Sequence, residues 1–202
     1  MILTLEDLSL KSANHLLFSN VSLTFLPGSV TILKGANGSG KTSLLRIIAG
    51  ISAPTSGRVL INDKDISQLA KPFVNYVGHN IGIKAELTVL ENIERMAENY
   101  NSRERIAAAI HFFGLKGHLM DKCYKLSAGN QKKVALCRLL ACNAKIWLLD
   151  EAETNLDEEN RRLLANCVYA QASSGGIIIS ATHIKENPYI TGQEVRLEDF
   201  SL

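Results

Sequence analysis

The sequence has little that would indicate a membrane span, a metal cluster or a nucleic-acid partner. None of its apolar runs approaches the roughly 20 residues that a bilayer-spanning helix needs. The net charge of +2 is too small to suggest nucleic acid as the main partner. The four cysteines, Cys123, Cys137, Cys142 and Cys167, are not spaced as metal ligands. The last three lie in apolar helical patterns, which are typical of core residues in a reducing compartment.

Nothing at the N-terminus of this sequence has the pattern of a signal peptide, and internal repeats and low-complexity linkers are also missing. Glu6 and Asp7 interrupt the first apolar run, unlike the central stretch of a signal peptide. At 202 residues, 46% of them apolar, the chain is long enough for one well-buried domain and short for two. We therefore expect one domain over residues 1–202, in the cytoplasm, with any membrane contact made through another subunit.

One stretch, residues 35–43, fits G-x-x-x-x-G-K-[ST], the phosphate-cradling P-loop. The β-branched apolar run 30–33 before it predicts a buried strand, and 42–49 predicts a short helix ending at Gly50. A chance glycine-rich turn would not have this strand and helix around it. The expected nucleoside triphosphate site comprises Gly35, Ala36, Asn37, Gly38, Ser39, Gly40, Lys41, Thr42 and Ser43. Lys41 would reach the outer phosphates, and the Thr42 hydroxyl would ligate Mg²⁺.

The remaining patterns predict a mixed α/β fold. Residues 1–33 alternate as β-structure, and the turn signal at Pro27 and Gly28 predicts a hairpin that places a small antiparallel sheet around the P-loop strand. Two further runs, 146–149 and 177–180, are apolar without alternation, as in parallel strands covered on both faces. The stretch between the P-loop and the first of these runs has helical periodicity, so we expect a helical insert over roughly 85–140.

Polar residues follow the predicted core strands, where an open α/β sheet binds its ligands. Asp150 would hold Mg²⁺, and Glu151 would orient or deprotonate the attacking water. The alternative for this acidic pair is helix capping. His183 ends the third strand, and on the residues alone it is as much a candidate for structural hydrogen bonding as for contact with the γ-phosphate.

A second anion-binding helix start is predicted at 126–131, with Ser127 as its N-cap. An ordinary capped helix is the alternative. One P-loop already serves one triphosphate, so this site is best explained if it serves the nucleotide of another molecule. The residues concerned are Ser127, Ala128 and Gly129.

The run 126–131, Leu-Ser-Ala-Gly-Asn-Gln, resembles the LSGGQ signature of ATP-binding cassette proteins. The order of motifs resembles theirs over nearly the whole chain: P-loop, helical insert, signature, Walker B acids, a D-loop at 154–157 and a switch histidine at His183. This order is unlike that of P-loop kinases and small GTPases. Residues 76–88 and 126–136 are similar, more narrowly, to the ATP-binding subunits of haem exporters in cytochrome c maturation.

The resemblance implies an α/β P-loop ATPase domain that hydrolyses ATP with Mg²⁺. Two copies would meet head to tail, with integral membrane transporter subunits as partners, at the cytoplasmic face of the inner membrane. Glu151, His183 and Lys41 would be catalytic, and Thr42, Asp150 and His79 would lie on the metal side. His79 stands where most cassettes have the Q-loop glutamine, which is a departure from the family pattern, as are Asn130 and Ala152.

Two other functions remain open at this point. One is service to an unrelated importer or exporter. The other is action on nucleic acid or ribosomes, although such proteins usually have two cassettes or long coiled coils. No haem ligand is evident, because substrate would meet the membrane subunits.

Overall fold

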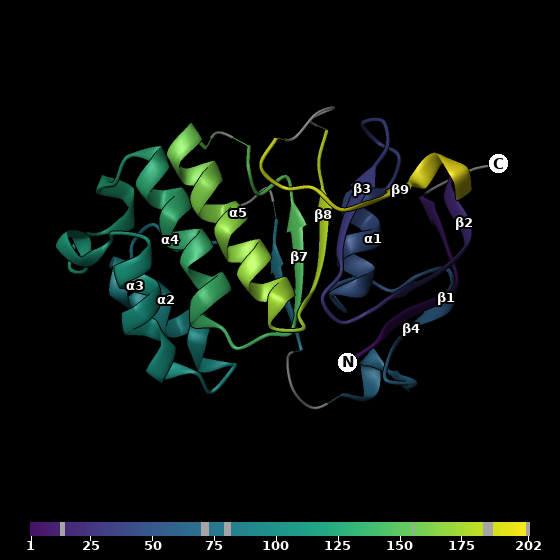
Figure 1. The fold of residues 1–202 in the computed structure, drawn as a ribbon, viewed down its shortest axis with the longest axis horizontal. Coiled ribbons are helices and arrows are strands. Elements are labelled where there is room, and N and C mark those ends of the chain that lie inside the picture. The colour runs from purple at the N-terminus through teal and green to yellow at the C-terminus, as the bar shows by residue number, and fades with distance from the viewer. Residues whose placement is uncertain (13–14, 70–72, 79–81, 155, 184–187, 201–202) are drawn as a thin grey trace.

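The structure, a computed structural model, describes the chain except residues 13–14, 70–72, 79–81, 155, 184–187 and 201–202. Its centre is a parallel sheet of five strands in the order β6-β7-β8-β3-β9 (Figure 1). These strands are β3 (Val30–Lys34), β6 (Val74–Val77), β7 (Ile146–Asp150), β8 (Ile177–Ala181) and β9 (Gln193–Arg196). All neighbouring pairs run parallel, so the carboxyl ends of β3, β7 and β8 meet at one edge.

A second sheet is antiparallel, with strands in the order β2-β1-β4-β5. It consists of β1 (Leu3–Ser12), β2 (His15–Phe25), β4 (Ser56–Ile61) and the short β5 (Lys64–Asp65). Alternation in β2 matches burial, because Val21 and Phe25 are buried while Ser22 is exposed. The antiparallel sheet expected from the sequence is therefore present, but it does not include the P-loop strand β3.

The expected hairpin at Pro27 and Gly28 was wrong. A turn does form there, with Gly28 at φ 81°, but it leads from β2 in one sheet to β3 in the other. The amide of Gly28 donates to the carbonyl oxygen of Gly176 at 2.9 Å, beside the start of β8. The middle of β3 is buried on both faces, so its place between β8 and β9 competes successfully with a local pairing to β2.

Five α-helices complete the described fold: α1 (Lys41–Ile48), α2 (Val89–Glu98), α3 (Ile106–Phe112), α4 (Ala128–Ala141) and α5 (Glu158–Ser173). Helices α2, α3 and α4 fall within the stretch for which a helical insert was expected. Short 3-10 turns are η1 (Ile66–Gln68), η2 (Arg103–Arg105), η3 (Lys116–His118), η4 (Cys123–Lys125) and η5 (Leu197–Phe200).

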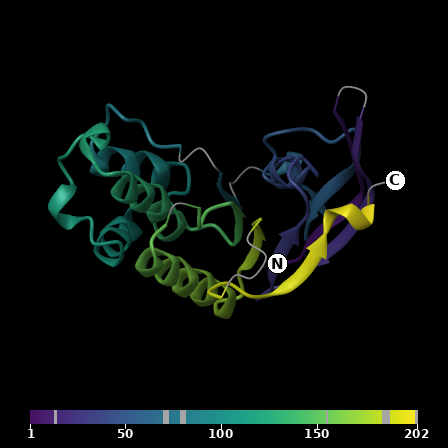
Figure 2. The ribbon, with the colours of Figure 1, turned by 90° about the horizontal axis from the view of Figure 1, so that it is seen from above.

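Two apolar cores lie on opposite faces of the parallel sheet. Trp147 and Leu149 of β7 pack into the core shared with α2, α3, α4 and α5. Ile146 and Leu148 of the same strand pack into the other core, which α1 shares with the antiparallel sheet. Figures 1 and 2 both show α1 and the insert helices on opposite sides of β7 and β8. This double coverage explains why the core strands are apolar without alternation.

Among the described residues, no helix has the length and apolar character to cross a bilayer.

Candidate nucleotide-binding and hydrolysis site

The P-loop motif joins the end of β3 to the start of α1, as the sequence predicted. Gly38 and Gly40 have φ values of 82° and 98°, which residues other than glycine rarely adopt. A Cβ on Gly40 would also lie 3.1 Å from the ring of Phe18, a tight contact that would force the ring to shift. The loop borders a cavity of about 320 Å³ whose lining residues include Leu17, Lys41, Thr42 and Glu151.

Lys41 is folded back over this loop. Its Nζ donates to the carbonyl oxygens of Gly35 at 2.6 Å and Ala36 at 2.8 Å, and the residue is 7% exposed. The hydroxyl oxygen of Ser39 is buried and has no hydrogen-bond partner among the described residues. A mobile cation and an unsatisfied hydroxyl at a helix start fit a bound phosphate group.

Thr42 and Asp150 lie together although 108 positions separate them. The Thr42 hydroxyl donates to Oδ1 of Asp150 at 3.0 Å, and Asp150 is only 3% exposed. Its other oxygen, Oδ2, accepts from the Tyr76 hydroxyl at 2.8 Å. Burial, together with the Asp150 hydrogen bond, raises the pKa of Tyr76 to about 12, so the hydroxyl remains a donor at neutral pH. A hydroxyl and a carboxylate are ligand types that suit Mg²⁺.

Glu151 comes next and adopts φ 53°, which is uncommon for a residue other than glycine. Its amide donates to Ala181 at 2.9 Å, which ties the turn after β7 to the end of β8. Oε1 of Glu151 lies 3.2 Å from Nδ1 of His183. Lys132 of α4 also acts on this carboxylate. Burial lowers the pKa of Lys132, and the Glu151 charge opposes that shift.

An acidic residue of η5, which follows the edge strand β9, contacts the P-loop. Oε1 of Glu198, in η5, accepts from the amide of Ala36 at 2.6 Å. Because β9 pairs with β3, the residues that follow β9 lie beside the first residues of the P-loop. Glu198, His183 and Lys34 are among the residues that line a second cavity of about 520 Å³.

The candidate signature residues lie apart from the cavity that the P-loop borders. Ser127 caps α4, its hydroxyl accepting from the amide of Asn130 at 3.3 Å, as predicted. None of Ser127, Ala128 and Gly129 lines the cavity at the P-loop. Figures 1 and 2 show why, since α4 and α1 lie on opposite sides of β7 and β8. Within one chain the structure therefore does not bring the two anion-binding helix starts together.

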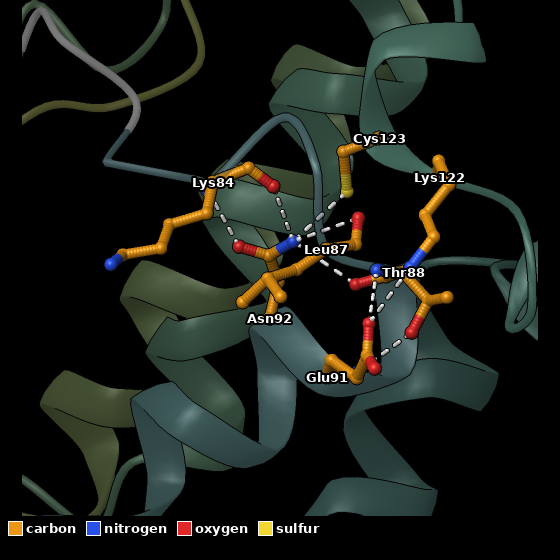
Figure 3. Close-up of polar contacts among 7 residues, drawn as sticks. All are labelled: Lys84, Leu87, Thr88, Glu91, Asn92, Lys122 and Cys123. Carbon is orange, nitrogen blue, oxygen red and sulfur yellow. Dashed lines mark hydrogen bonds and ion pairs between the residues drawn. The ribbon is translucent and has the colours of Figure 1, made fainter.

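The start of α4 is supported by a buried amide, Asn92 of α2 (Figure 3). Its Oδ1 accepts from the Lys84 amide at 2.7 Å, and its Nδ2 donates to the carbonyl oxygens of Lys84 at 2.9 Å and Thr88 at 3.0 Å. The same nitrogen lies 3.2 Å from Sγ of Cys123, whose carbonyl oxygen accepts from Gln131 of α4. Asn92 thereby links the segment before α2 to the turn that leads into α4.

The sequence singled out most of the residues found here. His79 and Asn155 lie outside the described residues, so their placement stays a prediction. Two residues of the site were not predicted from the sequence. Tyr76 opens the run 76–88, but nothing in that run indicates a contact with Asp150, and Glu198 stands in no recognisable motif. Among the described residues there is no group of three or more His, Cys, Asp or Glu side chains placed to hold a metal ion.

Comparison with known proteins agrees with this geometry. Residues 18–154 match the ABC transporter family. A cytochrome c biogenesis ATP-binding export protein CcmA of Rickettsia felis is 50% identical over 186 residues, which cover 92% of this chain and 95% of the relative. A protein of the same name from Nitrosomonas europaea is 37% identical over 188 residues, with 90% and 88% covered.

Solved structures support the same fold. A putative ABC transporter ATP-binding protein from Pyrococcus furiosus superposes with a TM-score of 0.85 at 23% identity, covering 100% of both chains. A dimeric ATP-binding cassette in a post-hydrolysis state, bound to ADP and Pi, superposes with a TM-score of 0.78 at 25% identity, covering 90% of this chain and 88% of that one. The chain therefore belongs to the ATP-binding cassette family of transporter ATPases and, within it, to the group of the cytochrome c biogenesis ATP-binding export proteins.

Proposed function

We propose that this chain binds and hydrolyses ATP as a peripheral subunit of an export complex in cytochrome c biogenesis, the haem exporter expected from its sequence. The observation that carries the catalytic part is the convergence of Thr42, Asp150 and Glu151 beside the P-loop, from two distant parts of the chain. The export role rests on the similarity to the export proteins compared above.

In this site each residue has a distinct role. Lys41 exchanges its two backbone carbonyl partners for phosphate oxygens, and the amides at the start of α1 surround the same phosphate. Thr42 and Asp150 would hold Mg²⁺, which supplies positive charge against the charge that develops on the phosphates. Glu151 orients the attacking water and takes its proton, while His183 holds the carboxylate from the neighbouring strand end.

A second copy of the chain completes the site. Ser127, Ala128 and Gly129 are remote from the cavity in their own chain, so they would face the nucleotide of a partner in a head-to-tail dimer. ATP binding would close the dimer, and hydrolysis would let it open again. Integral membrane subunits at the cytoplasmic face of the inner membrane would receive this motion. Haem would meet those subunits and not this chain.

Nucleotide binding is tested by calorimetric titration with Mg·ATP. Lys41→Ala is expected to lose detectable binding, because the loop loses its mobile cation. Lys116→Ala, which changes an exposed lysine of η3, is the matched control and is expected to bind normally. Unchanged affinity in Lys41→Ala would contradict the assignment of the phosphate site.

The export role is tested by purifying the tagged chain, with detergent, from the membranes of its own cells. We expect it to bring along integral membrane proteins of cytochrome c maturation. Deleting the chain is expected to abolish holocytochrome c while leaving other membrane haem proteins intact. Recovery of ribosomal proteins, or of another transporter's subunits, would point to one of the alternative functions.

A further inference from the structure

We propose that Tyr76 is a positioning residue for Asp150, whose carboxylate it holds in the orientation that the Mg²⁺ site requires. The inference rests on the proposed role of Thr42 and Asp150 in holding that ion. Tyr76 would not touch the ion or the nucleotide. It would act only through the oxygen of Asp150 that faces away from Thr42.

Two elements hold the Asp150 carboxylate, one at each oxygen. The Thr42 hydroxyl, from α1, donates to Oδ1 at 3.0 Å. The Tyr76 hydroxyl, from β6, donates to Oδ2 at 2.8 Å. A carboxyl group with one donor on each oxygen has its plane fixed, whereas one with a single donor can rotate about its Cβ–Cγ bond. Asp150 is 3% exposed, so little water is available to replace a lost donor.

The backbone places Tyr76 for this contact. β6 is the neighbour of β7, with Tyr76 opposite Leu148, two residues before Asp150. Side chains lean along a strand, so a long tyrosine on β6 reaches the residue at the end of β7. The phenol is half-buried and packs against the core that contains α1.

Gly78 gives the ring its space. A Cβ at this position would lie 2.9 Å from both Cε1 and the hydroxyl oxygen of Tyr76, closer than real Cβ atoms approach. The φ of Gly78 is not in the left-handed region, so its backbone would accept alanine. Gly78 is therefore needed for the space that it leaves. A side chain at this position would displace the Tyr76 hydroxyl, which donates to Asp150.

The primary test measures Mg²⁺ dependence of nucleotide binding in Tyr76→Phe, which retains the ring and removes only the hydroxyl. Affinity for a fluorescent ATP analogue is measured in EDTA and then across a Mg²⁺ titration. In EDTA we expect the same affinity as in the wild type. The Mg²⁺ concentration at half-effect is expected to rise roughly tenfold, the lower end of the loss seen when an outer partner of a metal ligand is removed.

Tyr100→Phe is the matched control. Its hydroxyl donates at 2.7 Å to the carbonyl oxygen of Val74, which belongs to β6 as well. Removing it costs the same strand one phenolic hydrogen bond without touching Asp150. We expect the Mg²⁺ midpoint of Tyr100→Phe to equal that of the wild type. An equal shift in both tyrosine variants would mean that general loosening of β6 causes the effect, and would overturn the proposal.

Gly78→Ala tests the same contact without changing either partner. We expect it to shift the Mg²⁺ midpoint in the same direction as Tyr76→Phe. The double variant is expected to shift it no further than the larger single shift, because both changes break one hydrogen bond. Fully additive shifts would contradict the shared mechanism.

The outcomes separate this inference from the proposed function. If wild-type binding depends on Mg²⁺ and Tyr76→Phe keeps the wild-type midpoint, the positioning role is wrong and the metal site stands. If wild-type binding is indifferent to Mg²⁺, the metal site fails and the inference fails with it. Hydrolysis gives a second readout, since saturating Mg²⁺ is expected to restore most of the wild-type rate to Tyr76→Phe.

Discussion

The imidazole of His183 lies 3.2 Å from the carboxylate of Glu151, measured from Nδ1 to Oε1. The two residues follow adjacent parallel strands, β8 and β7, and the Glu151 amide is itself bonded to Ala181 at the end of β8. The orientation of Glu151 is therefore set jointly by the two strand ends. A change at either residue is expected to alter hydrolysis more than nucleotide binding.

Glu151→Gln is expected to bind ATP and stop turnover. The amide has the shape of the carboxylate but cannot take a proton from water. With hydrolysis blocked, the head-to-tail dimer is expected to accumulate, and gel filtration with ATP measures it. Glu158→Gln, an exposed change at the start of α5, is the control and should hydrolyse normally. Wild-type turnover in Glu151→Gln would exclude Glu151 as the catalytic carboxylate.

Ser127→Arg is expected to leave the nucleotide affinity of the monomer nearly intact and to block hydrolysis. The arginine would fill the loop at the start of α4, which in the proposed head-to-tail dimer would face the nucleotide of the partner and not its own. Mixing this variant with Lys41→Ala protein gives the decisive measurement. In a head-to-tail heterodimer one site contains both defects and the other contains neither, so part of the ATPase activity should return.

A mixture that forms heterodimers but stays inactive would exclude independent action of the two sites in this arrangement. Cysteines introduced at positions 39 and 128, in differently tagged chains, then distinguish the remaining explanations. Cross-linking between chains would support the head-to-tail geometry with obligate coupling of the two sites. Its absence would contradict that geometry.

Asn92→Leu is expected to destabilise the protein by about 1–3 kcal/mol, because the Lys84 amide loses its acceptor and the buried hydrogen bonds of the Asn92 amide are lost. The Asn92 residue is 2% exposed, and its side-chain amide bonds to backbone groups of Lys84 and Thr88, which precede α2. Asn99→Ala, at the exposed C-terminal end of the same helix, should change stability by about 0.5 kcal/mol or less. Urea denaturation measures both variants, and equal losses would show that Asn92 has no special role.

The buried thiols predict a loss of stability at alkaline pH. Burial raises the pKa of Cys142 to about 11 and that of Cys167 to about 12, and it raises the pKa of Cys137 as well. In the unfolded chain these thiols ionise at about pH 8.5, so the stabilising difference is fully present below that pH and is lost as the pH rises through the folded values. Each thiol would lower the free energy of unfolding by up to about 1.4 kcal/mol per pH unit in this window.

Urea titrations from about pH 8 to pH 10 measure this slope, and Cys142→Ala should make it shallower. A disulfide-exchange reagent gives an independent check at pH 8. We expect no fast-reacting thiol in the native protein and four after denaturation, since all four cysteines are buried. Fast reaction of the native protein, or an unchanged slope in the variant, would contradict the assignment.

The sequence was a good guide wherever a motif fixes both residue type and local conformation. The P-loop, Asp150 with Glu151, and the Ser127 cap all have such signals, and the structure places them at strand or helix ends. The sequence did not predict which sheet contains β3, because a turn such as Pro27–Gly28 does not specify the strand with which the next strand pairs. The role of Tyr76 was missed for a related reason. Its hydrogen bond to Asp150 depends on the order of the strands and on the absence of a side chain at Gly78.

The hydrogen bond from the Ala36 amide to Glu198 has a practical consequence. Through this bond η5, the turn after β9, contacts the phosphate loop, although the two are far apart in the sequence. A change that displaces η5 would take this acceptor away from the Ala36 amide, and its effect on the loop could be mistaken for a weak intrinsic affinity for nucleotide. An environment-sensitive dye on Asp199 would use the same proximity to report occupancy of the loop without a labelled nucleotide.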